Sequence, residues 1–193
     1  RLDLTPAQQV AAATALVETL SVDQRLALEQ ELQEHQPALT IWSPLPGPQS
    51  TAYYSAADEI FYGGASGGGK SSLIAGLALT RHRRSLIIRR ESTQLRGLID
   101  DIARLIKTRD GLNNQLGQWR IPPRTPHFSA LFPDQLIEFG GVPNPGDEER
   151  HQGIAHDLLA FDEVTQLTEY VVNYLSTWNR TVEPGQRCRM VLT

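Results

Sequence analysis

Residues 64–71 read Gly-Ala-Ser-Gly-Gly-Gly-Lys-Ser, a run whose glycines, lysine and terminal hydroxyl suit the binding of phosphate. A loop of this kind leaves backbone N–H groups free to surround phosphate oxygens, and the helix that follows adds the positive end of its dipole. Lys70 would reach the β- and γ-phosphates of a nucleotide, and the Ser71 hydroxyl would bind Mg²⁺. The sequence thus predicts a nucleotide site at Gly64, Ala65, Ser66, Gly67, Gly68, Gly69, Lys70, Ser71 and Ser72.

A pair of carboxylates follows an apolar run further along the chain. Residues 158–161, Leu-Leu-Ala-Phe, end at Asp162 and Glu163, which is typical of a buried parallel strand. An α/β sheet presents its chemistry at the ends of such strands. There Asp162 would orient Mg²⁺, usually through water, and Glu163 would polarise the water that attacks the γ-phosphate. A phosphate-loop kinase needs no such carboxylate, so the pair favours hydrolysis.

The elements that must position these groups can be predicted from apolar periodicity. Residues 59–63 are expected to form the strand before the loop, and residues 71–79 the helix after it. Residues 119–140 alternate in a way that favours antiparallel strands. The remaining predicted elements are a strand at 85–89, a helix at 91–108, a turn-rich loop at 141–147, a strand at 158–161, a helix at 169–178 and a strand at 189–192. This order predicts an α/β fold with a mainly parallel sheet flanked by helices.

The first third of the chain differs in character from the rest. Residues 1–36 contain two capping boxes, at 5–8 and 21–24, and predict a helical hairpin that docks either on the main domain or on a partner. Residues 37–50 contain four prolines and are expected to form an extended linker. Residues 51–193 then form the α/β core.

Composition limits the class of protein. The chain has 193 residues, of which 40% are hydrophobic and 21% charged, and a net charge of −4. These values fit a globular domain and argue against a wholly basic protein that coats nucleic acid. The sequence contains no apolar run of membrane-spanning length. Cys188, the only cysteine, cannot form an internal disulfide, so we expect a reducing cytoplasm and a cysteine packed in a strand.

Basic residues are concentrated in one short region. Its members are Arg81, Arg83, Arg84, Arg89, Arg90 and Arg96. Two interpretations stay open: the first three complement the negative end of the helix at 71–79, or some of the six contact phosphate.

Several families of phosphate-loop proteins can be set aside from their motifs. The sequence contains neither the Asn-Lys-x-Asp guanine motif of GTPases nor the Leu-Ser-Gly-Gly-Gln signature of transporter ATPases. A two-lobed helicase would need a second motor domain, for which 193 residues give no room.

Over nearly its whole length the chain resembles the ATPase domain of the large terminase subunit of tailed bacteriophages. The resemblance rests on an ordered set of segments, namely Pro-Gln at 48–49, Tyr-Gly and the phosphate loop at 62–71, Leu-Ile-Ile-Arg-Arg-Glu at 86–91, His-Gln-Gly at 151–153, Leu-Leu-Ala-Phe-Asp-Glu at 158–163 and Met-Val-Leu-Thr at 190–193. In the family the last segment continues as Gly-Asn-Pro. We therefore expect the chain to be the N-terminal part of a longer protein whose nuclease domain lies beyond Thr193, and we expect no DNA cleavage by this part.

The resemblance implies a fold, an activity and partners. The fold would be that of a P-loop NTPase of the ASCE or RecA-like type, with ATP and Mg²⁺ as ligands. The activity would be ATP hydrolysis that powers translocation of double-stranded DNA into an empty capsid. Partners would be double-stranded DNA, the portal protein, the small terminase subunit and further copies in a homo-oligomeric ring, with no membrane. The protein would act in the host cell cytoplasm, at the procapsid portal.

The resemblance also implies roles for single residues. Gln49 would read adenine, since an amide both donates and accepts hydrogen bonds, although it also fits an ordinary helix or linker glutamine. Thr193 would lie on the strand between the phosphate-loop strand and the Asp162 strand and couple γ-phosphate loss to movement, or would be an ordinary strand threonine. Some family members carry a catalytic arginine within the phosphate loop, where this chain has Ala65 and Ser66.

An arginine from a neighbouring subunit would then replace the missing one. Arg150 is the first candidate and Arg180 the second, and Arg150 could instead be a solvated partner of the preceding glutamates. Two other functions stay open besides the packaging motor. One is a nucleotide-binding assembly or regulatory module with negligible turnover, and the other is a cellular DNA-remodelling ATPase of the same lineage.

Overall fold

The computed structural model describes residues 15–25, 27–28, 41–65, 67–125, 128–129, 132 and 134–193. Within them, seven strands form one sheet in the order β1-β9-β8-β2-β7-β4-β3. The bounds of these strands, in chain order, are β1 (Glu59–Phe61), β2 (Arg84–Arg89), β3 (Leu112–Asn113), β4 (Gln118–Arg120), β7 (Leu136–Gly141), β8 (Leu158–Phe161) and β9 (Arg189–Leu192). A separate two-stranded sheet pairs β5 (Arg124–Thr125) with β6 (Phe128–Ser129).

The sheet is parallel from β1 to β7 and antiparallel at the β4 and β3 edge. This confirms the predicted mainly parallel α/β fold. The prediction of antiparallel strands at 119–140 is only partly right, because β7 pairs in parallel with β2 as well as antiparallel with β4. Strand β7 is buried along nearly its whole length, as expected for a strand with neighbours on both sides.

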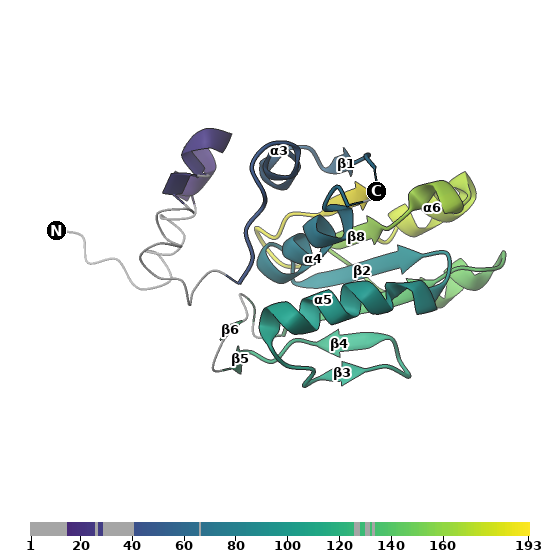
Figure 1. The fold of residues 1–193 in the computed structure, drawn as a ribbon. Helices are drawn as coiled ribbons and strands as arrows, with labels where there is room; N and C mark the ends of the chain where they lie inside the picture. Colours follow the sequence, from purple (N-terminus) through teal and green to yellow (C-terminus); the bar gives the residue numbers. More distant parts are fainter. Residues whose placement is uncertain are drawn as a thin grey trace.

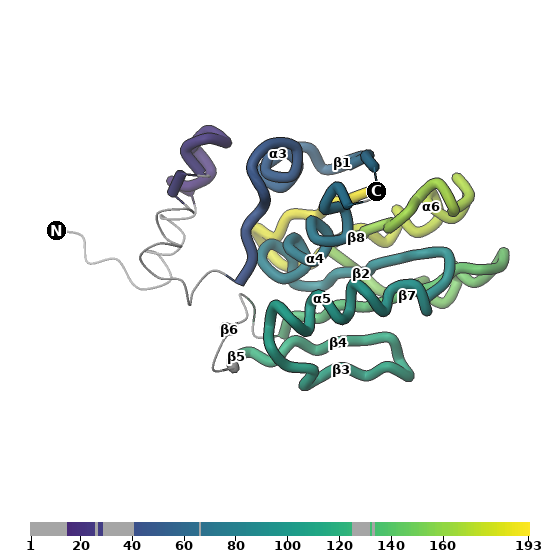
Figure 2. The backbone as a smooth tube through the Cα atoms, in the orientation of Figure 1, coloured from purple at the N-terminus to yellow at the C-terminus, as the bar shows by residue number. Residues whose placement is uncertain are grey.

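Helices cover both faces of the sheet (Figure 1). On one face lie α3 (Pro48–Tyr54), α4 (Lys70–Thr80) and α5 (Arg96–Ile106), packed on a core that includes Ile87 and Ala160. On the other lies α6 (Glu169–Ser176), packed on Leu159 and Phe161. Residues that alternate along β8 therefore pack into two separate cores. Figure 2 traces the path of the chain between the strands and helices.

Three short 3₁₀ helices lie between these strands and helices of the core. They are η1 (Ser92–Leu95), η2 (Asp147–His151) and η3 (Val164–Gln166). The predicted single helix at 91–108 is thus divided into η1 and α5. No described helix has the length and apolar character that crossing a membrane requires.

The segment before the core is more structured than an extended linker. Pro48 occupies the first turn of α3 and follows Gly47, whose φ is +96°, so the fixed φ of proline starts a helix here rather than continuing an extended chain. Trp42 lies against α4 so closely that a Cβ at Gly76 would meet its ring at 2.4 Å. The prediction of a linker over residues 37–50 is therefore wrong for its last part, and residues 37–40 lie outside the described residues.

The described part of the predicted hairpin is helical at 15–19 and again from residue 22. The second capping box is present: the Gln24 N–H donates to the Ser21 hydroxyl at 3.3 Å, and Ser21 N–H donates to the Gln24 side chain at 2.9 Å. The Arg25 guanidinium lies 5.8 Å from the centre of the Tyr54 ring, a contact with the main domain. The first box, at 5–8, lies outside the described residues.

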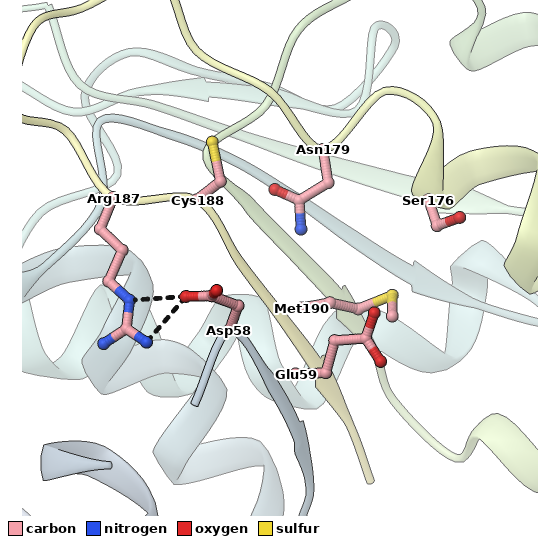
Figure 3. Close-up of a pocket in the computed structure, with 7 residues that line it drawn as sticks. All are labelled: Asp58, Glu59, Ser176, Asn179, Arg187, Cys188 and Met190. Carbon is pink, nitrogen blue, oxygen red and sulfur yellow. Dashed lines mark hydrogen bonds and ion pairs between the residues drawn. The ribbon is translucent and has the colours of Figure 1, made fainter. Parts of the chain in front are cut away.

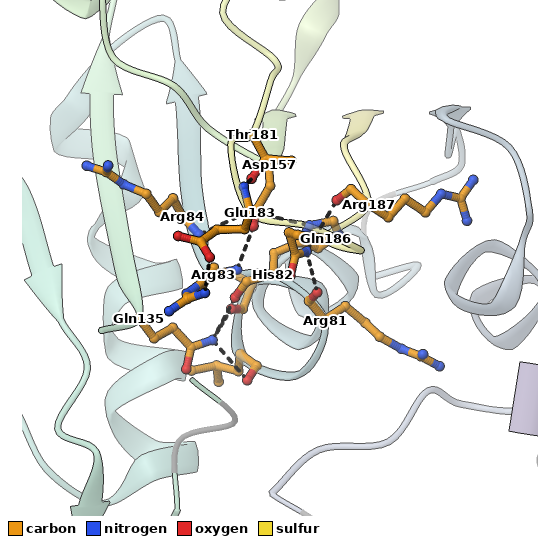
Figure 4. A network of polar contacts seen from close by, with 12 residues as sticks. Arg81, His82, Arg83, Arg84, Gln135, Asp157, Thr181, Glu183, Gln186 and Arg187 are labelled. Carbon is orange, nitrogen blue, oxygen red and sulfur yellow. Dashed lines mark hydrogen bonds and ion pairs between the residues drawn. The ribbon is translucent and has the colours of Figure 1, made fainter. Parts of the chain in front are cut away.

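A polar network closes the amino ends of the parallel strands (Figure 4). Asp157 accepts hydrogen bonds from the backbone N–H groups of Arg83 and Arg84, both at 3.0 Å. The Gln135 amide donates to the carbonyl oxygens of Ala78 and His82 at 2.7 and 2.9 Å, and so satisfies the end of α4.

Arg81, Arg83 and Arg84 belong to this end of the molecule. They follow the C-terminus of α4, about 16 Å along the helix from the phosphate loop. Arg83 pairs with Asp134 and Glu183, both at 2.8 Å. These three arginines therefore do not contact a phosphate held by the loop, whereas Arg89 of the predicted basic region ends β2 at the opposite edge of the sheet.

Candidate active site

The residues predicted to bind and hydrolyse a nucleotide lie at the carboxyl ends of the parallel strands. The phosphate loop follows β1, Asp162 and Glu163 follow β8, and Thr193 follows β9, which lies between β1 and β8. Parallel pairing of the three strands brings segments that are far apart in the sequence to one edge. The strand expected between the other two is β9, and Thr193 directly follows it, while its coupling role stays a prediction.

The loop depends on glycine at specific positions. Gly67 and Gly69 have φ values of +82° and +74°, a backbone region that side chains disfavour. A Cβ at Gly69 would also lie 2.6 Å from the Gln49 amide nitrogen, whereas a Cβ at Gly67 would meet nothing within 4 Å. Gly69 therefore combines a conformational requirement with a steric one. Ser66, a predicted member of the loop, lies outside the described residues.

Lys70 lies at the start of α4 and points back to the loop. Its Nζ donates hydrogen bonds to the carbonyl oxygens of Gly64 at 2.9 Å and Ala65 at 3.2 Å. The Tyr62 hydroxyl donates to the Gly68 carbonyl at 3.0 Å from the other side. The first N–H groups of α4 have no acceptor within the helix, and no described side chain caps this end. The arrangement is one that can hold an anion.

Gln49 connects α3 to the loop. Its side chain is buried, its Oε1 accepts from the Leu45 N–H at 2.6 Å, and its Nε2 donates to the Gly69 carbonyl at 2.9 Å. The amide keeps one further N–H and one further lone pair, so adenine recognition by Gln49 stays a prediction. The contacts of Gln49 show that it supports the loop, a role that the sequence did not indicate.

Ser71 and Ser72 have different surroundings. The Ser72 hydroxyl accepts a hydrogen bond from Trp42 Nε1 at 3.0 Å, which fixes the first turn of α4 from the segment before α3. Ser71, half-buried, is one position closer to the loop. Its hydroxyl and the carboxylate of Asp162 are oxygen donors of the kind Mg²⁺ prefers. No described group of three or more His, Cys, Asp or Glu side chains could hold a metal alone, and Mg²⁺ usually needs only one or two protein ligands beside substrate phosphates.

Asp162 is almost completely buried, with 2% of its surface exposed. Its Oδ1 accepts a hydrogen bond from the Thr193 hydroxyl at 3.0 Å, and its backbone N–H donates to the Ile88 carbonyl at 2.9 Å. A buried carboxylate requires such partners, because its transfer from water is costly. Asp162 is therefore held by both neighbouring strands, β2 and β9.

Glu163 has an unusual backbone. Its φ and ψ of +57° and +54° place a non-glycine residue in the left-handed region, a conformation that costs about 1–2 kcal/mol and is common at functional sites. Its Oε1 is bound by Arg89 Nη2, and its Oε2 by the Gln166 side-chain amide. The sequence did not indicate these two partners, although Arg89 ends a predicted strand whose carboxyl end must face the same edge.

The two candidate arginines are both exposed. Arg150 lies in η2, its side chain is 72% exposed, and its Nη2 pairs with Asp147 Oδ1 at 2.7 Å. This ion pair is with an aspartate rather than with the glutamates considered from the sequence. The Arg180 guanidinium lies 4.6 Å from the centre of the Trp178 ring. Neither has a described contact with the phosphate loop or with Glu163.

Two cavities lie away from this site. One, of about 370 Å³, is lined by Asp58, Ser176, Cys188 and neighbouring residues (Figure 3). Cys188 is half-buried and precedes β9, so the prediction of a cysteine packed within a strand is wrong. Partial burial raises the pKa of its thiol. The other cavity, of about 340 Å³, is lined by Tyr53, Arg81 and Arg189 among others, at the amino edge of the sheet.

Comparison with solved structures finds bacteriophage large terminases. The large terminase of a thermophilic bacteriophage, in one crystal form, aligns with a TM-score of 0.55 and 16% identity over 78% of this chain and 39% of that chain. The same terminase in complex with ADP aligns with a TM-score of 0.55 and 16% identity, over 77% and 38%. The HK97 bacteriophage large terminase aligns with a TM-score of 0.52 and 16% identity, over 78% and 33%.

No protein-family model and no curated protein matches this sequence. The chain spans between 33% and 39% of the length of the terminases it resembles. At this level of identity the likeness concerns the fold. The mixed sheet flanked by helices, with a glycine-rich loop between β1 and α4, is thus an α/β fold of the P-loop NTPase type, in the form found in solved bacteriophage large terminases.

Proposed function

We propose that this chain binds ATP with Mg²⁺ and hydrolyses it, and that hydrolysis powers translocation of double-stranded viral DNA into a procapsid. The observation that carries the proposal is the placement of the loop with Lys70 after β1, and of Asp162 and Glu163 after β8, at the same edge of the sheet. The likeness of the fold to large terminases, one of them in complex with ADP, supports both the nucleotide and the packaging role.

Each residue has a chemical task in the proposed reaction. The loop N–H groups and Lys70 would hold the phosphates, and Ser71 and Asp162 would hold the metal ion, directly or through water. When bound, Mg²⁺ neutralises charge that develops on the transferring phosphoryl group. Glu163 accepts a hydrogen bond from the attacking water and orients it toward the γ-phosphate.

Arg150 is proposed to act on the site of a neighbouring subunit. Its exposed side chain and its single described ion pair leave the guanidinium accessible to another chain. Ala65 supplies no cation within the loop, and an arginine supplied in trans accelerates related phosphoryl transfers by about 10³–10⁵-fold. Arg180, whose guanidinium packs on Trp178, is the second candidate.

The wider role follows the same proposal. Thr193 would sense loss of the γ-phosphate through Asp162, to which its hydroxyl donates a hydrogen bond. The chain would act in a homo-oligomeric ring with double-stranded DNA, the portal protein and the small terminase subunit. Its place of action would be the host cell cytoplasm, at the procapsid portal.

The test is ATP turnover with and without linear double-stranded DNA, in the wild type and in Glu163→Gln. We expect DNA to raise turnover and Glu163→Gln to reduce it by about 10²–10⁴-fold, the usual contribution of a general base. ATP binding, measured with a fluorescent analogue, should persist in the variant. Turnover that survives Glu163→Gln would contradict the proposed role of this residue.

Two other outcomes select other functions. Mg²⁺-dependent ATP binding without turnover, even with added DNA, would favour an assembly or regulatory module. Turnover that single-stranded and double-stranded DNA raise equally would favour a DNA-remodelling ATPase. For Arg150, mixtures of Arg150→Ala with Glu163→Gln should recover turnover that neither variant has alone, whereas Arg180→Ala should retain turnover by itself.

A further inference from the structure

Four arginine side chains line the cavity of about 340 Å³ at the amino edge of the sheet, beside the ends of α3 and α4. They belong to Arg25, Arg81, Arg187 and Arg189. Among the described residues that line the cavity, Glu18 alone carries a carboxylate. The cavity is therefore positively charged, although the whole chain has a net charge of −4.

Two of these arginines already stabilise the end of α3. Arg187 Nη1 donates to the Ser55 carbonyl at 3.1 Å, and its Nη2 pairs with Asp58 at 2.9 Å. Arg189 Nη1 donates to the Tyr53 carbonyl at 3.1 Å, and its Nη2 donates to the Ser55 carbonyl at 2.6 Å. The dipole of a helix favours cations near its C-terminus. Stabilisation of the helix end thus accounts for Arg187, which also has a carboxylate partner, and for part of Arg189.

The other two arginines have a different environment. The Arg81 guanidinium lies 4.7 Å from the centre of the Tyr53 ring, and the Arg25 guanidinium lies 5.8 Å from that of Tyr54. Within the described part of the chain, neither forms an ion pair with a carboxylate. A guanidinium over an aromatic ring keeps N–H donors at its edge. Figure 4 shows the Arg81 and Arg187 side chains on the same side of the polar network.

Arg189 is buried and begins β9. Its Nε has no hydrogen-bond partner among the described residues, and an unpaired buried donor is costly. Burial, together with the nearby charges of Arg187 and Arg81, lowers the pKa of Arg189 to about 10. The guanidinium is still charged at neutral pH, but its surroundings destabilise that charge. An anion in the cavity would stabilise it.

We propose that this cavity binds a terminal phosphate group, at a site separate from the phosphate loop. Guanidinium groups match the oxygens of a phosphate in geometry and in charge. A terminal phosphate carries a charge of about −1.5 to −2 at pH 7, whereas an internal phosphodiester of DNA carries a single charge and lies on the outside of the duplex. A recess with the buried Arg189 in its wall therefore favours the terminal group. Its source is either free phosphate or pyrophosphate, or the phosphorylated end of a DNA strand.

The proposed site is independent of the nucleotide. Lys70 is the first residue of α4 and Arg81 is its C-cap, so the two anion sites lie about 16 Å apart along the helix. Binding in the cavity does not require ATP hydrolysis by this chain. It can therefore be measured on a protein whose phosphate loop is impaired.

The first test measures how inorganic phosphate protects the arginines of the wild-type chain from phenylglyoxal, with peptide mass spectrometry as the readout. At about ten times Kd, one-site binding leaves about a tenth of the chains unoccupied, so phosphate should slow modification of Arg81 about 10-fold. Arg84 is exposed, follows the same helix and does not line the cavity, so it is the internal control and should react at an unchanged rate. Protection of both arginines, or of neither, would overturn the proposal.

The second test measures binding of phosphate and pyrophosphate by calorimetry in Lys70→Ala, a substitution that impairs the loop. In this background Arg81→Met removes the charge but keeps an apolar side chain over Tyr53. It should weaken binding about 10- to 100-fold, which corresponds to the loss of a hydrogen bond to a charged group. Arg84→Met is the matched control and should bind as Lys70→Ala does, and Arg81→Lys should have intermediate affinity.

Absence of binding in Lys70→Ala would contradict the proposal, as would equal weakening by Arg81→Met and Arg84→Met. The protection experiment needs no variant, so it decides the question even if Arg81→Met does not fold.

A DNA duplex with and without 5′-phosphates identifies the source of the phosphate, with protection of Arg81 again as the readout. Protection by the phosphorylated duplex and not by its unphosphorylated counterpart would assign the site to a DNA end. Protection by free phosphate and by neither duplex would assign it to a small anion. Both results support a terminal phosphate. Equal protection by the two duplexes would reject it, because internal phosphodiesters would then be the ligand.

Discussion

The Thr193 hydroxyl donates a hydrogen bond to Asp162 Oδ1 at 3.0 Å and so connects the end of β9 to the end of β8. Both residues are buried, with 7% and 2% of their surfaces exposed. The connection is reinforced by the backbone, since Val164 N–H donates to the Thr193 carbonyl at 2.8 Å. The buried carboxylate of Asp162 thus receives a hydrogen bond from a residue that is 31 positions away in the sequence.

Replacement of Thr193 by valine should destabilise the fold. Valine keeps the shape of the side chain but cannot donate to the buried Asp162 carboxylate, and hydrogen bonds to charged groups contribute about 1.5–3 kcal/mol. We expect Thr193→Val to lower the free energy of unfolding by about this amount, measured by urea denaturation. Thr193→Ser, which keeps the hydroxyl, is the control and should lose clearly less. Equal losses in the two variants would show that the hydroxyl does not stabilise Asp162.

The loop glycines should differ in their sensitivity to substitution. Gly67→Ala should be destabilising only because alanine disfavours a positive φ, since a Cβ at this position has open space around it. Gly69→Ala meets that cost and also displaces the Gln49 amide, whose nitrogen lies 2.6 Å from the built Cβ. We therefore expect Gly69→Ala to weaken binding of a fluorescent ATP analogue more than Gly67→Ala. The opposite order would mean that the Gln49 contact does not matter for the loop.

Much of this site could be predicted because its residues are adjacent in sequence. A glycine-rich loop between a strand and a helix, and two acids after an apolar run, are local patterns, and β9 has the predicted bounds of 189–192. The contacts of Arg89 are different in kind. They arise from the order of the strands, which places β2 beside β8, and apolar periodicity does not give strand order.

The departures in the fold have two origins. Residues 48–54 form α3 although prolines surround their start, because Gly47 and Pro48 together begin a helix and Tyr53 packs into the core. Strand β7 alternates like a strand of a hairpin, yet its residues are buried by neighbours on both sides. The start of α3 is thus a local signal that the surrounding prolines obscure, whereas in β7 tertiary packing overrides the local pattern.

Stability should decrease as the pH falls below about 6.5. Burial lowers the pKa of His82 below its ordinary value of 6.5, against the opposing effect of Asp157, and burial also lowers the pKa of His151. In this range the unfolded chain binds more protons than the folded chain, so protonation favours unfolding. The contribution of each histidine is complete above the unfolded pKa and is lost as the pH falls toward the folded one.

The measurement is the free energy of unfolding between pH 7.5 and 5. His82→Gln and His151→Gln should each reduce the slope of stability against pH, whatever they do to stability itself. Glu138 affects stability at lower pH than the histidines do. Burial alone would raise the pKa of its carboxyl, but the hydrogen bond to His156 holds that pKa below its ordinary value of 4.5. If neither histidine variant changes the slope of stability against pH in this interval, the slope does not come from His82 and His151.

Two helical glycines should respond in opposite directions to the same substitution. At Gly76 in α4 an added Cβ would lie 2.4 Å from the Trp42 ring, so alanine must push the indole away, together with its hydrogen bond to Ser72. Overpacking of this kind costs about 1–3 kcal/mol. At Gly97 in α5 nothing lies within 4 Å of the added Cβ, and alanine should stabilise by about 0.4–1 kcal/mol because it restricts the unfolded chain. Urea denaturation of Gly76→Ala and Gly97→Ala measures both, and a Gly76→Ala variant as stable as the wild type would mean that Trp42 does not pack on α4 in solution.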